Sequence, residues 1–494
     1  MTRASWTLPE PDSGESTPSA NPDGSSVELQ TDPNPPEPGF SEPGSSVAQV
    51  DDGADATARP RRRGLHRMSS SGRTFAALSV RNYRIYFTGA LLSNVGTWMQ
   101  RVAQDWLVLE LTHGSDLAAL AVGITTALQF LPMLLITPYG GVIADRFDKR
   151  VVLRITQTWM AVSAAALGLL AVLGVAQAWH VFVLAFIFGV GTAFDNPARQ
   201  AFVSEVVGRE HLPNAIGLNA ASFNAAKLIG PAVAGAVIAA FGSGWAILAN
   251  AISYLSFIIA LALIDPTRLQ PVERTKRAKR QIREGLAYIR GRSDIILVLC
   301  IVLFVGTFGL NFQMTSALMA QQVFRRGAGQ YGILGTFMAI GSLAGALVGA
   351  RRKTAPRGRF IVAVAVAFCV IEAVVGMMPT YWTYAALLPI MGLASMLTLN
   401  AANMSVQMGV DPQLRGRVMA IYVMVMQGGT PIGAPLMGWV AGVFGARWTL
   451  IGGGLFALLG VLVSVAIMAR RGGISITPEI RLHPPRLSMH TRVR

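Results

Sequence analysis

Residues 138–154 read PYGGVIADRFDKRVVLR and decide how the surrounding chain folds. A long apolar run precedes this stretch, over residues 117–137, and another follows over residues 151–175. Between the runs, just after Gly140 and Gly141, lies a short charged segment made of Asp145, Arg146, Asp148, Lys149 and Arg150. Apolar runs of this length are typical of membrane spans, and so short a link makes them a helical hairpin. The glycines allow close packing, and the cations place the turn on the cytoplasmic side.

The composition places most of the chain in lipid. Its 494 residues are 52% hydrophobic and 14% charged, with a mean hydropathy of +0.46, whereas soluble domains carry about 25% charged residues. The net charge of +16 would suggest nucleic acid in a soluble protein. Here the cations cluster in short loops, which is the pattern that sets membrane topology, so we expect a lipid bilayer and no nucleic-acid partner. Cys300 and Cys369 lie inside apolar runs and are interpreted as packing residues.

Twelve segments are long and apolar enough to cross a hydrocarbon core of about 30 Å, which takes roughly 20 helical residues. We predict spans at 84–110, 117–140, 151–174, 180–203, 214–241, 245–264, 294–315, 328–350, 360–378, 381–408, 415–443 and 447–469. The predicted fold class is therefore an all-α integral membrane protein with twelve transmembrane helices.

An internal repeat divides the spans into two sets of six. When the chain is shifted by 203 residues, Gly230, Gly235, Phe241, Gly242 and Trp245 fall on Gly433, Gly438, Phe444, Gly445 and Trp448. The fifth span thus corresponds to the eleventh. This pattern predicts two pseudo-symmetric six-helix bundles that face a central cavity.

The predicted organisation has five parts, and both termini are expected in the cytoplasm. Loops 112–116, 176–180 and 242–244 would be external and contain no Lys or Arg, although Arg325, Arg326 and Arg447 are exceptions. No signal-peptide pattern precedes the first span, so we expect a multi-pass plasma-membrane protein without a cleaved leader. The parts are a disordered tail (1–73), the first bundle (74–264), a cytoplasmic linker with an amphipathic helix (265–293), the second bundle (294–470) and a C-terminal tail (471–494).

The opening stretch resembles the loop between helices two and three of the major facilitator superfamily. Gly141, Asp145, Arg146, Lys149 and Arg150 occupy the motif positions, while Asp148 stands where a glycine is usual. Residues 81–100, RNYRIYFTGALLSNVGTWMQ, resemble the exporter branch that includes macrolide and siderophore efflux proteins. The resemblance implies a gate, in which the loop binds the start of the eleventh span, near residues 415–418, and stabilises the outward-open state.

A second motif resembles one found mainly in proton-coupled exporters of this superfamily. It comprises Gly230, Pro231 and Gly235 in the fifth span, with Gly217 and Ala226 at the upstream glycine positions. Small residues and a proline give a closely packed, bendable seam between helices. A plain helix-packing face is the alternative interpretation.

Ionisable side chains inside the predicted spans mark candidate functional residues, because they are costly there. Arg101 and Asp105 lie four residues apart and share one helix face. We hypothesise that Asp105 takes part in proton coupling or substrate binding beside Arg101, and a static ion pair is the alternative. A further hypothesis places Asp195, which precedes Arg199 by one turn, against Lys227 in a pair that breaks during transport; a structural pair is again the alternative. Glu110 and Glu372 rank lower.

The sequence favours a transporter over an enzyme. It contains no Gly-x-x-x-x-Gly-Lys-Ser/Thr phosphate loop and no Cys/His cluster with metal spacing, so we expect no cofactor or metal. The resemblance implies a monomeric secondary transporter that exports an amphiphilic small molecule by alternating access, with protons as the coupling ion. Uptake or facilitated passage through the same fold, and a membrane sensor without flux, stay open as alternatives.

Overall fold

The computed structural model describes residues 75–270, 281–352, 354–470, 474–479 and 486–491. The side chains at 138–139, 141–142, 144–145, 281–282, 350 and in the last two ranges are outside this description. The predicted N-terminal tail, part of the linker and part of the C-terminal tail also lie outside the described residues.

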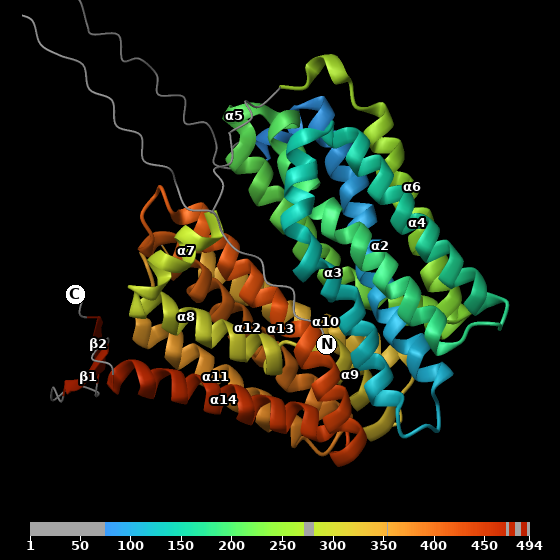
Figure 1. Cartoon of the computed structure of the whole chain (residues 1–494). Coiled ribbons are helices and arrows are strands. Elements are labelled where there is room, and N and C mark those ends of the chain that lie inside the picture. Colours follow the sequence, from blue (N-terminus) through green and yellow to red (C-terminus); the bar gives the residue numbers. More distant parts are fainter. Residues whose placement is uncertain (1–74, 271–280, 353, 471–473, 480–485, 492–494) are drawn as a thin grey trace, which may run out of the picture. The chain divides into compact units, whose positions relative to one another are not determined.

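The first bundle consists of long helices in chain order (Figure 1). After the short η1 (Ala76–Ser79) come α2 (Arg81–Leu111), α3 (Ala118–Arg146), α4 (Lys149–Val172), α5 (Ala178–Phe241) and α6 (Ser243–Leu263). The element α5 has 64 residues, roughly three bilayer thicknesses at the helical rise, but it breaks at Gly208. Glycine adopts the φ of 70° found there without the steric cost that a side chain would add. The predicted fourth and fifth spans are the two legs of α5.

The direction of the chain reverses at this break. Before it, α5 runs antiparallel to α2, with Phe202 against Tyr86 and Arg199 against Ser93. After it, residues 215–230 run parallel to residues 83–98 of α2. Gly208 thus connects two antiparallel legs, as the two predicted spans require.

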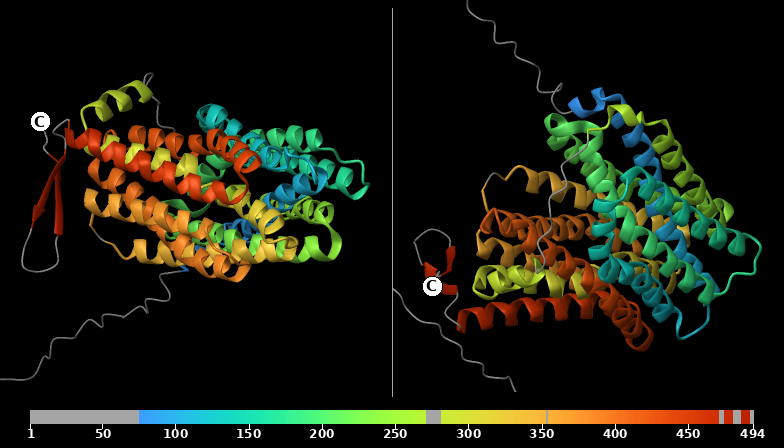
Figure 2. Two further views of the ribbon diagram at one scale, coloured as in Figure 1. Left: turned by 90° about the horizontal axis from the view of Figure 1, so that it is seen from below. Right: turned by 45° about the horizontal axis from the view of Figure 1, so that its top comes forward.

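The second bundle follows the linker elements η2 (Pro266–Arg268) and α7 (Gln281–Arg290). Its seventh predicted span is a broken helix that extends to Val323, eight residues beyond the predicted end, and contains two wide helical turns. The elements are α8 (Ser293–Phe304), η3 (Val305–Gly309), α9 (Phe312–Leu318), η4 (Met319–Val323), α10 (Ala328–Ala350), α11 (Gly358–Gly376), α12 (Tyr381–Gly409), α13 (Arg415–Phe444) and α14 (Arg447–Arg470). An antiparallel pair of strands, β1 (Ile474–Glu479) and β2 (Arg486–Thr491), follows α14 within the predicted C-terminal tail, where no strand was predicted (Figure 2).

Most of these helices have the length and apolarity of membrane spans. Nine segments of the described chain meet both criteria, and α5 is counted once among them. With α5 taken as two legs and the more polar α2 and α13 added, the helices correspond one to one with the twelve predicted spans. Large apolar side chains are exposed on the outer faces, as expected for lipid contact; on α4 they are Ile155, Trp159, Val162 and Leu169.

The backbone confirms the predicted repeat at the ends of the fifth and eleventh spans. Gly242 and Gly445 are 203 residues apart, and both have a φ of 92°. Each amide donates a hydrogen bond to the carbonyl four residues earlier, that of Ile238 or Ala441. The two equivalent helices therefore end in the same local conformation, and the fold has two pseudo-symmetric bundles.

Candidate functional site

Two contacts made by small residues join the bundles at one side of the membrane. A Cβ atom added to Gly438 of α13 would lie 2.7 Å from the carbonyl oxygen of Ala119 in α3. A Cβ atom added to Gly235 of α5 would lie 3.0 Å from the Cα of Gly332 in α10. Only small residues allow backbones to approach this closely. We call the α3–α13 and α5–α10 contacts the seal.

The same two helices are open at the other side. Ile216 and Gly217 of α5 are exposed, and so are Gly416 and Ala420 of α13. A Cβ atom added to Gly217 or Gly416 would have no described atom within 4 Å. This side also holds the charged turn between α3 and α4, and we call it the basic side. The bundles are thus in contact at the seal and separated along these helices at the basic side.

A cavity of about 220 Å³ lies between the bundles next to the seal. Both bundles contribute to its wall, which is mostly aromatic and apolar with a few polar groups, as in typical ligand sites. Side chains that line it include Trp98, Arg101, Thr126, Phe130, Lys227, Asn311, Gln313, Met314, Tyr331, Met338 and Met396.

Two cations, Arg101 and Lys227, face this cavity. The Arg101 guanidinium lies 5.0 Å from the Trp98 ring centre and 4.8 Å from that of Phe130. The Lys227 ammonium lies 5.4 Å from the same Trp98 ring. Among the described side chains, neither cation has a carboxylate oxygen within 4.0 Å, and the Arg101 Nε is buried without a hydrogen-bond partner. Arg101 and Asp105 therefore lie beyond ion-pair distance from one another in this state, although their charges still interact.

Asp105 lies at the contact between the bundles. It is 2% exposed, and the Gln313 side chain at the start of α9 in the second bundle is close enough to interact with it. The next residue, Trp106, stacks on Tyr331 of α10 with ring centres 5.9 Å apart. The carboxylate is thus placed where a relative movement of the bundles would change its surroundings.

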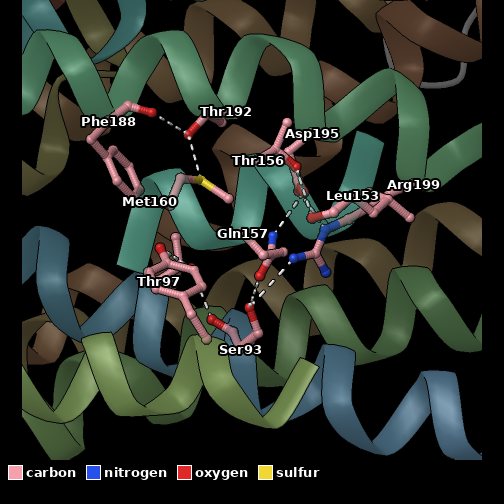
Figure 3. Close-up of polar contacts among 11 residues, drawn as sticks. Ser93, Thr97, Leu153, Thr156, Gln157, Met160, Phe188, Thr192, Asp195 and Arg199 are labelled. Atoms are coloured by element: carbon pink, nitrogen blue, oxygen red, sulfur yellow. Dashed lines mark hydrogen bonds and ion pairs between the residues drawn. The ribbon is translucent and has the colours of Figure 1, made fainter. Parts of the chain in front are cut away.

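Asp195 and Arg199 form a satisfied network within the first bundle (Figure 3). Arg199 Nε donates to Asp195 Oδ2 at 2.5 Å, and Asp195 Oδ1 accepts from Thr156 at 2.9 Å and Gln157 at 2.7 Å. Arg199 also approaches Ser93 of α2 at 3.4 Å. The hypothesised Asp195–Lys227 pair is not formed in this state, because the i,i+4 arginine on the same helix holds the Asp195 carboxylate.

The charged turn is anchored within the first bundle. The Asp148 carboxylate caps α4 by accepting hydrogen bonds from the amides of Arg150 at 2.7 Å and Val151 at 3.3 Å, which explains an acid where the motif usually has glycine. Lys149 pairs with Glu205 at 2.7 Å, and Arg150 donates to the carbonyls of Leu261 and Ala262. Arg146 is exposed. The Asp145 side chain is outside the described atoms, so its contact with residues 415–418 stays a prediction.

The glycine–proline motif of α5 has two packing roles. Gly230 faces Trp98 and Met99 of α2, whereas Pro231 and Gly235 face α10 across the bundle interface. The motif is therefore part of the seal, and Gly217 is at the open end of the same helix.

Glu372 was ranked low from sequence and is more deeply buried than we expected. It is 1% exposed, and its Oε2 atom has no hydrogen-bond partner among the described atoms. Gly309 and Gly453 lie beside it. The sequence shows a single acid in an apolar span, but it does not show whether that side chain faces the lipid or the protein interior. The described residues contain no group of three His, Cys, Asp or Glu side chains suited to a metal ion.

Comparison with known proteins places this fold and cavity in a family. The model of the family described as "Transmembrane secretion effector" matches residues 72–494. The staphyloferrin A transporter of Staphylococcus aureus is 25% identical over 76% of this chain and 92% of its own length, and the multidrug efflux pump Tap of Mycolicibacterium fortuitum is 29% identical over the same shares. A crystal structure of a bacterial homologue of the lysosomal transporter Spinster, in an inward-facing, occupied conformation, superposes with a TM-score of 0.62 at 15% identity, covering 82% of this chain and 98% of that one. The chain belongs to the transmembrane secretion effector family of the major facilitator superfamily, and it is a membrane transporter.

Proposed function

We propose that this transporter exports an amphiphilic small molecule in exchange for protons by alternating access. The observation that carries the proposal is a cavity lined by both bundles, closed at the seal and accessible along α5 and α13 at the basic side. Such a cavity requires a second state in which the seal opens and the basic side closes, because otherwise nothing could cross.

The charge distribution indicates the side of the membrane to which the cavity opens. Loops with an excess of Lys and Arg face the cytoplasm in multi-pass proteins, so the basic side is assigned to the cytoplasm. The state described above is then open to the inside, and it accepts its substrate from the cytoplasm or the inner leaflet. The names of the relatives, a siderophore transporter and a multidrug efflux pump, agree with export of an amphiphile.

Asp105 is our candidate for the proton-coupling group. Its carboxylate lies close to Gln313 of the second bundle in the sealed state, and opening the seal would separate the two helices and admit water from outside. Protonation removes the charge that Gln313 binds, so it weakens this contact and favours the open seal. Proton binding and bundle movement are thereby linked at one residue.

Purified protein in sealed liposomes with an internal pH dye tests this proposal. Hydrophobic cations, macrolides and siderophores are added in turn, and we expect at least one compound to trigger proton flux against a protein-free control. Asp105→Asn should abolish the proton flux while substrate binding persists. Glu372→Gln serves as the matched control, since it removes a buried carboxylate that lies away from the cavity.

Three outcomes distinguish the alternatives. Substrate movement without any proton movement would overturn coupling and leave facilitated passage or uptake. Proton flux that survives in Asp105→Asn but fails in Glu372→Gln would move the carrier into the second bundle. If the protein binds these compounds but moves none of them across the membrane, a sensor would be favoured and the transport proposal contradicted.

A further inference from the structure

We infer that the cavity selects organic anions: the unpaired cations Arg101 and Lys227 bind a carboxylate or similar acidic group of the substrate beside the Trp98 ring. This inference rests on the proposed transport function and adds the chemical class of the substrate.

The charges around the cavity do not balance. Arg101 and Lys227 are the charged side chains that line it, and each interacts with the other as a like charge. The acid next to them, Asp105, attracts Arg101 from beyond ion-pair distance, while Asp195 is neutralised by Arg199 in a separate network. Even if Asp105 were fully charged, one positive charge would be left over in this region. A cation within a membrane protein is costly unless it faces a partner or a pathway, and the missing partner here is an anion.

The two cations converge on one place. Both lie within 5.4 Å of the Trp98 ring centre, which holds them by cation–π attraction on the cavity wall. The buried Nε of Arg101 has no hydrogen-bond partner among the described atoms, so a donor stays available. A carboxylate can accept from a guanidinium through two oxygens and attract the ammonium at the same time, which satisfies both groups.

The rest of the wall explains why the anion would be amphiphilic. Met314, Met338 and Met396 of the second bundle line the cavity opposite the first-bundle residues Phe130 and Trp98. Methionine is flexible and polarisable, and it adapts to apolar groups of varied shape. The cavity therefore offers a charged end on the first bundle and an adaptable apolar wall on the second.

A set of probes that share the dansyl fluorophore tests the inference in the full-length protein. Dansylglycine carries a carboxylate, dansylglycinamide is its neutral amide, and dansylcadaverine carries an amine. Binding is measured in detergent through energy transfer from tryptophan to the dansyl group, and transport of the same probes is measured in proteoliposomes. We expect dansylglycine to bind at least about 10-fold more tightly than the other two, since a hydrogen bond to a charged group changes affinity roughly 10- to 100-fold.

Variants identify the residues. Arg101→Gln and Lys227→Gln should each remove most of the preference for the carboxylate, and Arg101→Lys and Lys227→Arg should retain part of it. The control Arg84→Gln removes a cation from the exposed start of the same helix as Arg101 and should leave binding unchanged. A cooperative thermal unfolding transition at the same temperature as in the parent protein shows that a variant which loses binding is still folded.

The outcomes separate the class of substrate from transport itself. Equal or tighter binding of the amide or the amine, absence of dansylglycine binding, or unchanged dansylglycine binding in both glutamine variants would overturn the inference. Transport of the amine alone would leave the exporter standing and refute the anion class. Selective binding of dansylglycine without movement of any probe would support the anion site and contradict the proposed export.

Discussion

Two groups of intramembrane charges in the first bundle differ in whether neighbouring side chains neutralise them. Asp195 and Arg199 are buried together, and three neighbouring side chains complete their hydrogen bonds. Arg101 and Lys227 lie on the cavity wall, where aromatic rings are near but no described carboxylate is within ion-pair distance. The first group joins α2, α4 and α5 into one body, whereas the second faces the space between the bodies. We propose that structural charges are those with a partner inside the bundle, and that functional charges are those without one.

The largest effect is expected where the satisfied pair is broken. Asp195→Asn leaves the Arg199 guanidinium buried without a counter-charge and should lower the free energy of unfolding by about 3 kcal/mol. Reversible unfolding in mixed micelles measures this change. The double variant with Arg199→Gln is the control and should be less destabilised than Asp195→Asn. If the single variant were as stable as the parent protein, the network would not have the structural role assigned to it.

A bulky residue in the seal should have the next largest effect. Gly438→Leu forces a side chain against the α3 backbone, and overpacking of this kind costs about 1–3 kcal/mol in the sealed state. We expect the equilibrium to move roughly 5- to 150-fold towards the state with an open seal, as measured by cysteine labelling from outside. Gly416→Leu enters open space on the basic side and should have no such effect. Equal labelling in the two variants would contradict the assignment of the seal.

A smaller shift is expected at the charged turn. If Asp145 binds the start of α13 in the outward-open state, Asp145→Asn removes a charge–dipole interaction of about 0.3–1 kcal/mol. The same labelling assay should then show a modest, roughly two- to fivefold, shift towards the inward-open state. Increased external labelling would show that the turn stabilises the opposite state.

The smallest effect on stability is expected for Lys227 in the cavity, although its substitution removes an intramembrane charge as Asp195→Asn does. Lys227→Gln removes an unpaired cation, so the free energy of unfolding should fall by no more than about 0.5 kcal/mol. Most of the preference for the anionic probe should nevertheless be lost. A destabilisation as large as that of Asp195→Asn would mean that Lys227 has a structural partner, and the comparison would fail.

The sequence predicted the helices well because apolar length and glycine position determine them. The spans, the repeat and the break between the fourth and fifth spans all follow from local composition, and the start of α13 agrees with its prediction to the residue. The partners of the buried charges could not be predicted, because the pattern in all-apolar helices does not show which face points inwards. Asp195 was therefore assigned to Lys227 instead of Arg199, and the depth of Glu372 was missed.

The most direct test of alternating access is a distance measured across the seal. Spin labels at Leu117→Cys and Val443→Cys, in a chain with Cys300→Ser and Cys369→Ser, are placed at exposed positions that flank the α3–α13 contact. We predict a short and a long distance population in liposomes, with the long one growing in acidic buffer and this response lost in Asp105→Asn. A single short distance that stays unchanged by pH and by every transported probe would contradict the account.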